Sequence, residues 1–165
     1  MRLTFRPATT EDAPQMASLR TAVADQLTQQ YGHGPWSSAT SEKGALYSVR
    51  NSRVFAAFQA EELIAIFQFV TKKPWAIDTN YFTVCLQPLY LIGLNVAPPW
   101  QRRGVGRCCL EEAVKIARAW PADAIRLDAF AAQAGAGDFY ARCGFRETGR
   151  KTYRDAPLIY FELLL

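Results

Sequence analysis

The segment LYLIGLNVAPPWQRRGVGR, residues 89–107, decides the fold of this chain. Its first part, Leu89–Val96, is strongly apolar and predicts a buried strand, which two prolines end. The glycines Gly104 and Gly106 follow and open an amphipathic helix that we expect to run from Gly104 to Trp120. A strand that passes through a glycine turn into a helix points free backbone N–H groups and the positive end of the helix at one place. The segment therefore predicts a site for a phosphate or pyrophosphate.

The residues around these glycines support that interpretation and also limit it. Arg102, Arg103 and Arg107 form the tightest basic cluster of the chain and would add positive charge around a compact anion. The dinucleotide-binding fingerprint is excluded because its third glycine would stand at the position of Cys109. The P-loop is excluded because the chain has no string with its glycine, lysine and hydroxyl spacing. Taken alone, the two glycines are also compatible with a purely structural turn.

Hydrophobic periodicity predicts the remaining elements, in the order β-α-α-β-β-β-α-β-α-β-β. Strand patterns cover residues 2–6, 54–59, 63–71, 125–129, 145–152 and 158–165, and helical patterns cover about 10–30, 41–51 and 134–142. Residues 72–87 suggest a loop or a short extra strand. Antiparallel hairpins combined with crossover helices predict an α/β (mixed α+β) fold. We expect a central mixed, mostly antiparallel sheet of six to seven strands with helices on both faces.

Length and composition restrict the class of protein. With 165 residues, half of them apolar or aromatic, we expect one globular domain over residues 1–165. No apolar run is as long as a membrane span and we find no signal-peptide pattern, so we expect a cytoplasmic protein with no membrane partner. The net charge of +4 permits polyanionic ligands, but no nucleic-acid-binding motif accompanies it, and we expect no nucleic-acid partner. The four cysteines lack zinc-site and disulfide spacings, so we expect reduced thiols and no metal.

Two motifs together resemble the GNAT superfamily of N-acetyltransferases. The pattern Gln101-x-x-Gly104-x-Gly106 after a strand is similar to the acetyl-CoA pyrophosphate loop of that family. Residues 139–145, FYARCGF, resemble its Phe-Tyr-x-x-x-Gly-Phe segment. The motifs stand in the family's order, and the predicted elements match the family fold over nearly the whole chain. The resemblance implies an enzyme that uses acetyl-CoA as co-substrate and acetylates a primary amine by direct attack on the thioester.

The resemblance also implies roles for particular residues. Backbone amides of the turn would hold the pyrophosphate, and the main chain of the preceding strand would hold the pantetheine arm and stabilise the oxyanion. Tyr140 corresponds to the general acid that protonates the departing CoA thiolate, although its position also suits a core aromatic residue beside Phe139. Gln133 stands where the family often has a cofactor-binding asparagine. The implied cofactor-binding residues are Leu94, Asn95, Val96, Gln101, Arg102, Arg103, Gly104, Val105, Gly106, Arg107 and Gln133.

The general base has no clear candidate in the sequence. An ammonium group must lose a proton before it is acetylated, and several family members use a glutamate on the strand before the turn. This chain has no carboxylate on that strand. Asp128, Glu62, His33 and a water chain remain as alternatives. His33 is also typical of a solvated loop residue, and Asp128 of an outward-facing strand residue.

A second function is compatible with the same fold, namely a non-catalytic acyl-CoA-binding or regulatory domain. It would keep the glycine turn and lose the catalytic groups, so the missing strand carboxylate favours it and Tyr140 argues against it. The acceptor, a small-molecule or peptide amine, is not identified by any motif. Many members of the family pair through their C-terminal strands, and the apolar segment Leu158–Leu165 would allow a homodimer.

Overall fold

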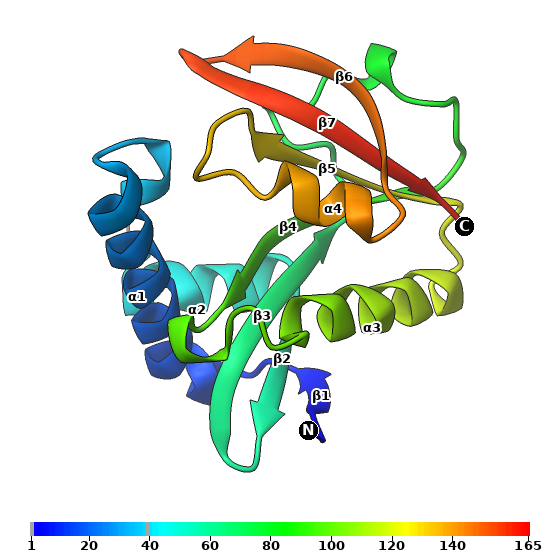
Figure 1. Cartoon of the computed structure of the whole chain (residues 1–165). Helices are drawn as coiled ribbons and strands as arrows, with labels where there is room; N and C mark the ends of the chain where they lie inside the picture. The colour runs from blue at the N-terminus through cyan, green and yellow to red at the C-terminus, as the bar shows by residue number, and fades with distance from the viewer. Residues whose placement is uncertain (1, 39) are drawn as a thin grey trace. The chain divides into compact units, whose positions relative to one another are not determined.

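Seven strands and four α-helices make up the part of the chain that this computed structural model describes, residues 2–38 and 40–165 (Figure 1). The strands are β1 (Thr4–Pro7), β2 (Arg53–Gln59), β3 (Glu62–Val70), β4 (Pro88–Val96), β5 (Ala124–Phe130), β6 (Arg146–Tyr153) and β7 (Ala156–Leu164). The helices are α1 (Ala13–Tyr31), α2 (Glu42–Asn51), α3 (Val105–Ala119) and α4 (Gly137–Arg142). The order of elements agrees with the order expected from hydrophobic periodicity.

The strands join in one sheet with the order β1-β2-β3-β4-β5-β7-β6. The pairs β1–β2, β2–β3, β5–β7 and β6–β7 are antiparallel, whereas β4 and β5 run parallel. The prediction of a mixed, mostly antiparallel sheet of six to seven strands is therefore confirmed. The connection between β3 and β4 contains only the short 3₁₀ turn η3 (Thr79–Tyr81) in place of a further strand.

The chain forms two compact units. The first unit contains the described residues up to Phe69 together with Gly93–Glu112, and the second contains Val70–Ile92 and Ala113–Leu165. The first unit therefore holds β1, β2, α1, α2 and all of β3 except its last residue, Val70, and the second holds β5, β6, β7 and α4. Strand β4 and helix α3 are each shared between the two units.

The core of the first unit lies between two helices and a β-hairpin. Met16 and Leu19 of α1 and Ala45 of α2 pack against Val54 and Ile66 on one face of β2 and β3. The opposite face of this hairpin is also buried, because Phe55 and Phe67 stack with their ring centroids 5.4 Å apart and Phe69 meets both of them edge-on. Helix α1 begins at Ala13, where the Asp12 carboxylate accepts hydrogen bonds from Arg6 and from the Thr9 N–H.

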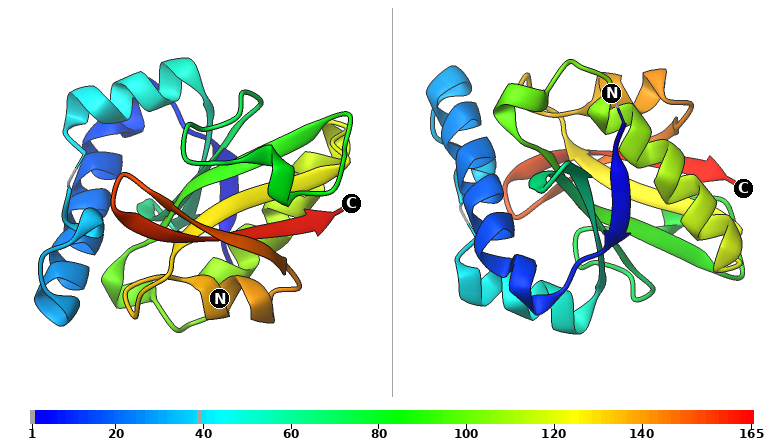
Figure 2. Two further views of the ribbon diagram at one scale, coloured as in Figure 1. Left: turned by 90° about the horizontal axis from the view of Figure 1, so that it is seen from above. Right: turned by 90° about the horizontal axis from the view of Figure 1, so that it is seen from below.

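The second unit is built on β5, β7 and β6, which lie side by side (Figure 2). A buried ion pair links the neighbouring strands β5 and β7. Arg126 of β5 and Glu162 of β7 are 4% and 2% exposed, and their Nε and Oε2 atoms are 3.3 Å apart. Both side chains also bind Thr83 in the β3–β4 connection, Arg126 through the Thr83 carbonyl and Glu162 through its hydroxyl at 2.6 Å. This network attaches the connection to the face of the sheet.

Helix α4 covers the other side of β7. Its Tyr140 ring lies 6.0 Å from that of Phe161 and 5.8 Å from that of Phe145. The helix begins at Gly137, three residues later than the predicted start at 134, because residues before it form a tight turn in which Gly135 donates its N–H to the Ala132 carbonyl.

Two further observations concern the chain as described. No helix among these residues is long and apolar enough to cross a membrane. Each of the four cysteines carries a thiol and forms no disulfide in the described chain, and burial raises the pKa of Cys109 to about 12.

Candidate functional site

The turn after β4 is shaped by backbone conformations that a glycine adopts most easily. Arg102 and Gly104 both have positive φ angles, 59° and 86°, and α3 begins immediately afterwards at Val105. The first backbone bond of this helix runs from the Cys108 N–H to the Gly104 carbonyl at 3.0 Å. The N–H groups of the preceding helical residues have no partner inside the helix, as at any helix N-terminus. The turn leads directly into a helix start, which is the local geometry that the sequence predicts, and the binding of an anion by its N–H groups stays a prediction.

Positive charge surrounds this turn on the protein surface. Arg102, Arg103 and Arg107 are all exposed. The guanidinium of Arg103 stands 5.6 Å from the ring centroid of Trp100, a cation–π distance that orients it beside the turn. The indole N–H of Trp100 in turn donates to Glu62 at 3.2 Å. Glu62 thus has a structural partner at the start of β3, which accounts for its presence without a role as general base.

Gln101, a predicted cofactor-binding residue, uses its side chain for hydrogen bonds within the protein. Its amide nitrogen donates to the Gln26 side-chain oxygen on α1 at 2.8 Å and to the Val96 carbonyl at 3.0 Å. The Gln101 side chain therefore holds the turn between the end of β4 and helix α1. Its contribution to ligand binding would be to position the turn.

Strand β4 contains a backbone irregularity at Gly93 that the sequence analysis missed. Gly93 has a φ of 62° in the middle of the strand, and a Cβ atom there would lie 3.1 Å from the side-chain nitrogen of Gln68. A glycine inside an apolar strand indicates such an irregularity and was the available signal. Beyond it lie the half-buried residues Leu94, Asn95 and Val96. In the described chain, the parallel ladder with β5 covers only Pro88–Tyr90, so these three residues follow its end.

Tyr140, the predicted general acid, lies on α4 in the second unit and is 8% exposed. Burial raises the pKa of its hydroxyl, and the negative charge of Asp128 raises it further. The hydroxyl consequently stays protonated at neutral pH. Its ring also packs against Phe139, Phe145 and Phe161, so the structural role considered from the sequence is present as well.

Asp128 is the candidate base that the structure places in an unusual environment. It lies on β5, opposite Tyr160 of β7 in the antiparallel ladder, and burial raises the pKa of its carboxyl. Cross-strand partners share one face of a sheet, so Asp128 and Tyr160 lie on the same face. A carboxyl with a raised pKa is a stronger base than an exposed one. The prediction of an outward-facing residue misses this burial, because residues 71–87 bind the same face through Tyr160 and Glu162.

Gln133 and His33 are both exposed and lie in turns. Gln133 precedes Gly135, where a Cβ atom would collide with the Phe130 carbonyl oxygen, so the small residues of this turn have a packing reason of their own. His33 lies between α1 and the 3₁₀ turn η2 (Pro35–Ser37), in a loop where the Trp36 indole donates to the Gly32 carbonyl at 3.0 Å.

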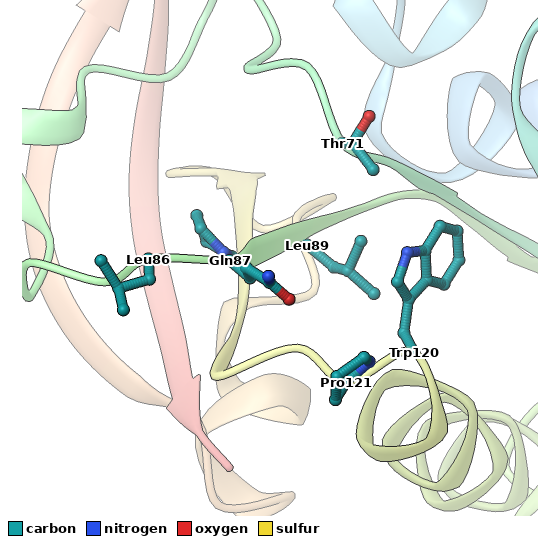
Figure 3. A pocket seen from close by; sticks show the side chains of 7 residues that line it. Thr71, Leu86, Gln87, Leu89, Trp120 and Pro121 are labelled. Carbon is teal, nitrogen blue, oxygen red and sulfur yellow. The ribbon is translucent and has the colours of Figure 1, made fainter.

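A surface pocket of about 490 Å³ lies in the second unit and is shown in Figure 3. Trp120 and Pro121 border it on one side, and Leu89 and Gln87 on the other (Figure 3). None of its lining side chains carries a charge, so the pocket supplies neither an acid nor a base.

The amino-acid sequence matches the model of a known protein family. The model described as the acetyltransferase (GNAT) family matches residues 18–145, which include both sequence motifs. A sequence comparison with curated proteins finds no match.

Solved structures share the fold at low sequence identity. A GCN5-related N-acetyltransferase from Rhodopseudomonas palustris has a TM-score of 0.75 at 20% identity, covering 100% of this chain and 97% of its own. The PaiA N-acetyltransferase from Thermoplasma acidophilum, in complex with coenzyme A, has a TM-score of 0.71 at 16% identity, covering 97% and 98%. The Salmonella typhimurium protein YncA, with its cofactor acetyl-CoA, has a TM-score of 0.71 at 16% identity, covering 99% and 94%.

Proposed function

This chain belongs to the acetyltransferase (GNAT) family, and on that premise we propose that it transfers the acetyl group of acetyl-CoA to a primary amine. Two structurally similar proteins were solved with coenzyme A or acetyl-CoA, which supports the choice of co-substrate. The acetyl group is the expected acyl group because acetyl-CoA is the form named for one of them.

One observation carries this proposal: an exposed turn with two positive φ angles leads directly into the N-terminus of α3 and is flanked by three exposed arginines. Such a turn suits a compact, doubly charged group, and the pyrophosphate of acetyl-CoA is one. The arginines add favourable Coulomb energy and speed the association of an anionic ligand.

The proposed reaction is a direct transfer. The neutral amine nitrogen attacks the thioester carbonyl carbon, forming the N–C bond and placing negative charge on the carbonyl oxygen. A backbone N–H in the segment Leu94, Asn95 and Val96 would donate to that oxygen, a contribution of about 10²–10³ in rate in other enzymes. Collapse of the intermediate breaks the C–S bond, and Tyr140 would give its proton to the departing thiolate. The attacking nitrogen, positively charged after the bond to carbon has formed, releases a proton to water as the amide forms, and a proton from water restores the Tyr140 hydroxyl. A tyrosine kept protonated by burial is in the correct state for that step.

The amine must first lose a proton, and we assign this step to Asp128, directly or through water. Burial raises the pKa of this carboxyl, which makes it a better proton acceptor than an exposed aspartate. Glu62 already accepts a hydrogen bond from Trp100, and His33 lies in an exposed loop, so neither has the same support.

Calorimetric titration with acetyl-CoA tests the co-substrate assignment. Replacing Arg107 with alanine removes a positive charge at the first turn of α3, and replacing Arg118 with alanine removes an equally exposed arginine from the last turn of the same helix. We expect micromolar binding by the wild type, about tenfold weaker binding by Arg107→Ala and unchanged binding by Arg118→Ala. No binding of acetyl-CoA or coenzyme A by the folded wild type would contradict the proposal.

A non-catalytic acyl-CoA-binding domain would give the same binding result. The two functions differ in turnover, which thiol release in the presence of a panel of primary amines measures. Turnover that depends on the amine supports the enzyme. Tight binding without turnover on any amine would leave the binding domain as the function.

A further inference from the structure

A second pocket, of about 360 Å³, opens between the β3–β4 connection and the hairpin of β6 and β7. One wall is formed by Lys73 and residues 75–79 of the connection, and the other by Lys151 and Tyr153 of β6. Figure 1 shows this green connection beside the orange and red hairpin. All of these residues belong to the second unit. The pocket shares no lining residue with the glycine turn.

The pocket presents flat aromatic surface to the solvent. Trp75 lines the pocket and is 84% exposed. Among the described residues, the exposed tyrosines Tyr47 and Tyr81 have lower values, 69% and 39%. Tyr153 lines the opposite wall. Single exposed apolar residues are ordinary, but an exposed indole that borders a cavity together with a second aromatic ring and charged groups is typical of a binding site. These two side chains suit a ligand with a flat ring.

The charges of the pocket favour an anion. The Asp78 carboxylate is already neutralised, because its Oδ2 lies 2.6 Å from the Lys151 ammonium and its Oδ1 accepts from the Asn80 N–H. The hydrogen bond from Lys151 lowers the pKa of Asp78, so this pair stays ionised at neutral pH. Lys73 donates only to neutral carbonyl oxygens, those of Ile77 at 2.9 Å and Pro74 at 3.3 Å. An ammonium has three donors, so one N–H of Lys73 remains for a ligand. Lys73, Lys151 and Asp78 together carry two positive charges and one negative charge, which leaves the pocket with one net positive charge.

We propose that this pocket binds an organic anion with a flat ring, such as an aromatic carboxylate, with the ring against Trp75 and the carboxylate against Lys73. The positive charge is held in place by the two carbonyl bonds, so little side-chain freedom is lost when the ligand binds.

Hydrogen bonds of Tyr160 connect the pocket lining to the strand pair that carries the candidate base Asp128. From this connection we infer a class of acceptor. The Tyr160 hydroxyl donates to the carbonyl of Ala76 and accepts from the Asp78 N–H at 3.2 Å, and both of those residues line the pocket. Tyr160 is the cross-strand partner of Asp128. The acceptor would then be an amine that also carries an aromatic ring and a carboxylate. This extension rests on the proposed acetyl transfer, whereas the binding of the aromatic anion does not.

Two-dimensional ¹H–¹⁵N NMR of the whole chain tests the binding. Phenylacetate is the probe, phenylacetamide removes its charge, and cyclohexylacetate removes its flat ring. We expect phenylacetate to shift the Trp75 indole signal with a Kd of about 1 mM or below, and each of the other two to bind at least about fivefold more weakly. Absence of saturation up to about 20 mM, or equal binding of phenylacetamide, would overturn the proposal.

Matched variants show where the probe binds. Trp75→Ala should weaken phenylacetate binding by about tenfold and Lys73→Gln by about threefold to fivefold, read from backbone signals of residues 76–79. Lys72→Gln changes the neighbouring exposed lysine, which does not line the pocket, and Tyr47→Ala changes an exposed aromatic residue on α2. Both controls should bind like the wild type. Equal losses in the controls would contradict the assignment.

Kinetics separate the acceptor class from the reaction itself. We expect phenylalanine to have a KM about tenfold lower than alanine, and Trp75→Ala to raise the KM of phenylalanine without changing kcat or the values for alanine. Equal kcat/KM for the two amino acids in the wild type would overturn the acceptor class. Absence of turnover on every amine would contradict the proposed function instead, and the NMR titration would still decide whether the pocket binds the anion.

Discussion

The side-chain amide of Gln101 donates a 2.8 Å hydrogen bond to the side-chain oxygen of Gln26, which joins the glycine turn to helix α1. The same nitrogen donates to the Val96 carbonyl at 3.0 Å, at the end of β4. One side chain therefore sets the position of the turn relative to two other elements of the first unit. This explains why a glutamine is useful three residues before Gly104 without any contact with a ligand.

Replacing Gln101 with leucine removes both hydrogen bonds and keeps a similar volume. Each bond contributes about 1 kcal/mol, so we expect the turn to lose part of its preorganisation and coenzyme A to bind about tenfold more weakly. Calorimetric titration measures the change. Gln29→Leu, at an exposed position of α1, is the control and should bind normally. An unchanged Kd for folded Gln101→Leu would remove the positioning role.

Replacing Tyr140 with phenylalanine should lower kcat by about 10²–10³ and leave the Kd for coenzyme A unchanged, since general-acid catalysis is typically of this size. Burial raises the pKa of Tyr140, so the acid keeps its proton across the neutral range. Its ionisation would therefore lower the rate only above its raised pKa. The exposed Tyr47→Phe serves as control. Turnover that Tyr140→Phe leaves intact would show that this tyrosine is purely structural.

Asp128→Asn should stabilise the protein at neutral pH while it slows the proposed reaction. Burial raises the native pKa of Asp128 above its unfolded value. The carboxyl therefore adds stability below the unfolded pKa near 3.8, and this contribution is lost as the pH rises through the raised native pKa. The difference amounts to about 1.4 kcal/mol for each pKa unit between the two states.

Urea unfolding at about pH 3 and pH 7 checks the sign of this effect. The gain in free energy of unfolding from Asp128→Asn should be present at the higher pH and absent at the lower. Asp25→Asn, at an exposed position of α1, is the control and should show no such dependence. If the asparagine variant is less stable than the wild type at neutral pH, the Asp128 carboxylate is held in its ionised form by the fold.

Replacing Glu162 with glutamine should destabilise the protein by about 3–5 kcal/mol, since Arg126 would then be a buried charge without a countercharge. Denaturant unfolding gives the free energy. Glu147→Gln removes the exposed partner of Arg150, whose Nε lies 2.6 Å from the Glu147 carboxylate, and should cost about 0–1 kcal/mol. A small loss for Glu162→Gln would mean that the Thr83 carbonyl, the Tyr90 hydroxyl and water are sufficient partners for the Arg126 guanidinium.

The sequence anticipates the elements of this fold well because each is specified locally. The apolar run of β4, the glycine turn and the amphipathic pattern of α3 lie within about 30 consecutive residues, and their interactions are short-range. The boundaries differ by one to three residues, as at α4, where the turn around Gly135 delays the helix. The β3–β4 connection has no periodicity, and its position depends on Thr83, Arg126 and Glu162, which lie far apart in the chain.

For the candidate site, too, some features are predicted from the sequence and others are visible only in the structure. Motifs predict roles for the turn, its arginines and Tyr140, and the structure adds that the Gln101 side chain is hydrogen-bonded to Val96 and Gln26. The irregularity at Gly93 has a visible sequence signal, a glycine inside an apolar strand, whose meaning depends on the positive φ angle that the structure gives it.

The sequence by itself determined the family, the order of the elements and the glycine turn, because spacing and periodicity along the chain encode them directly. Only the tertiary structure decided which charged groups are buried and which remain available. Asp128 has a raised pKa because residues 71–87 and β7 share its face, and the Asp78 carboxylate in the second pocket forms an ion pair with Lys151, more than seventy positions away. Burial and charge pairing depend on distances in space, which separation along the chain does not reveal.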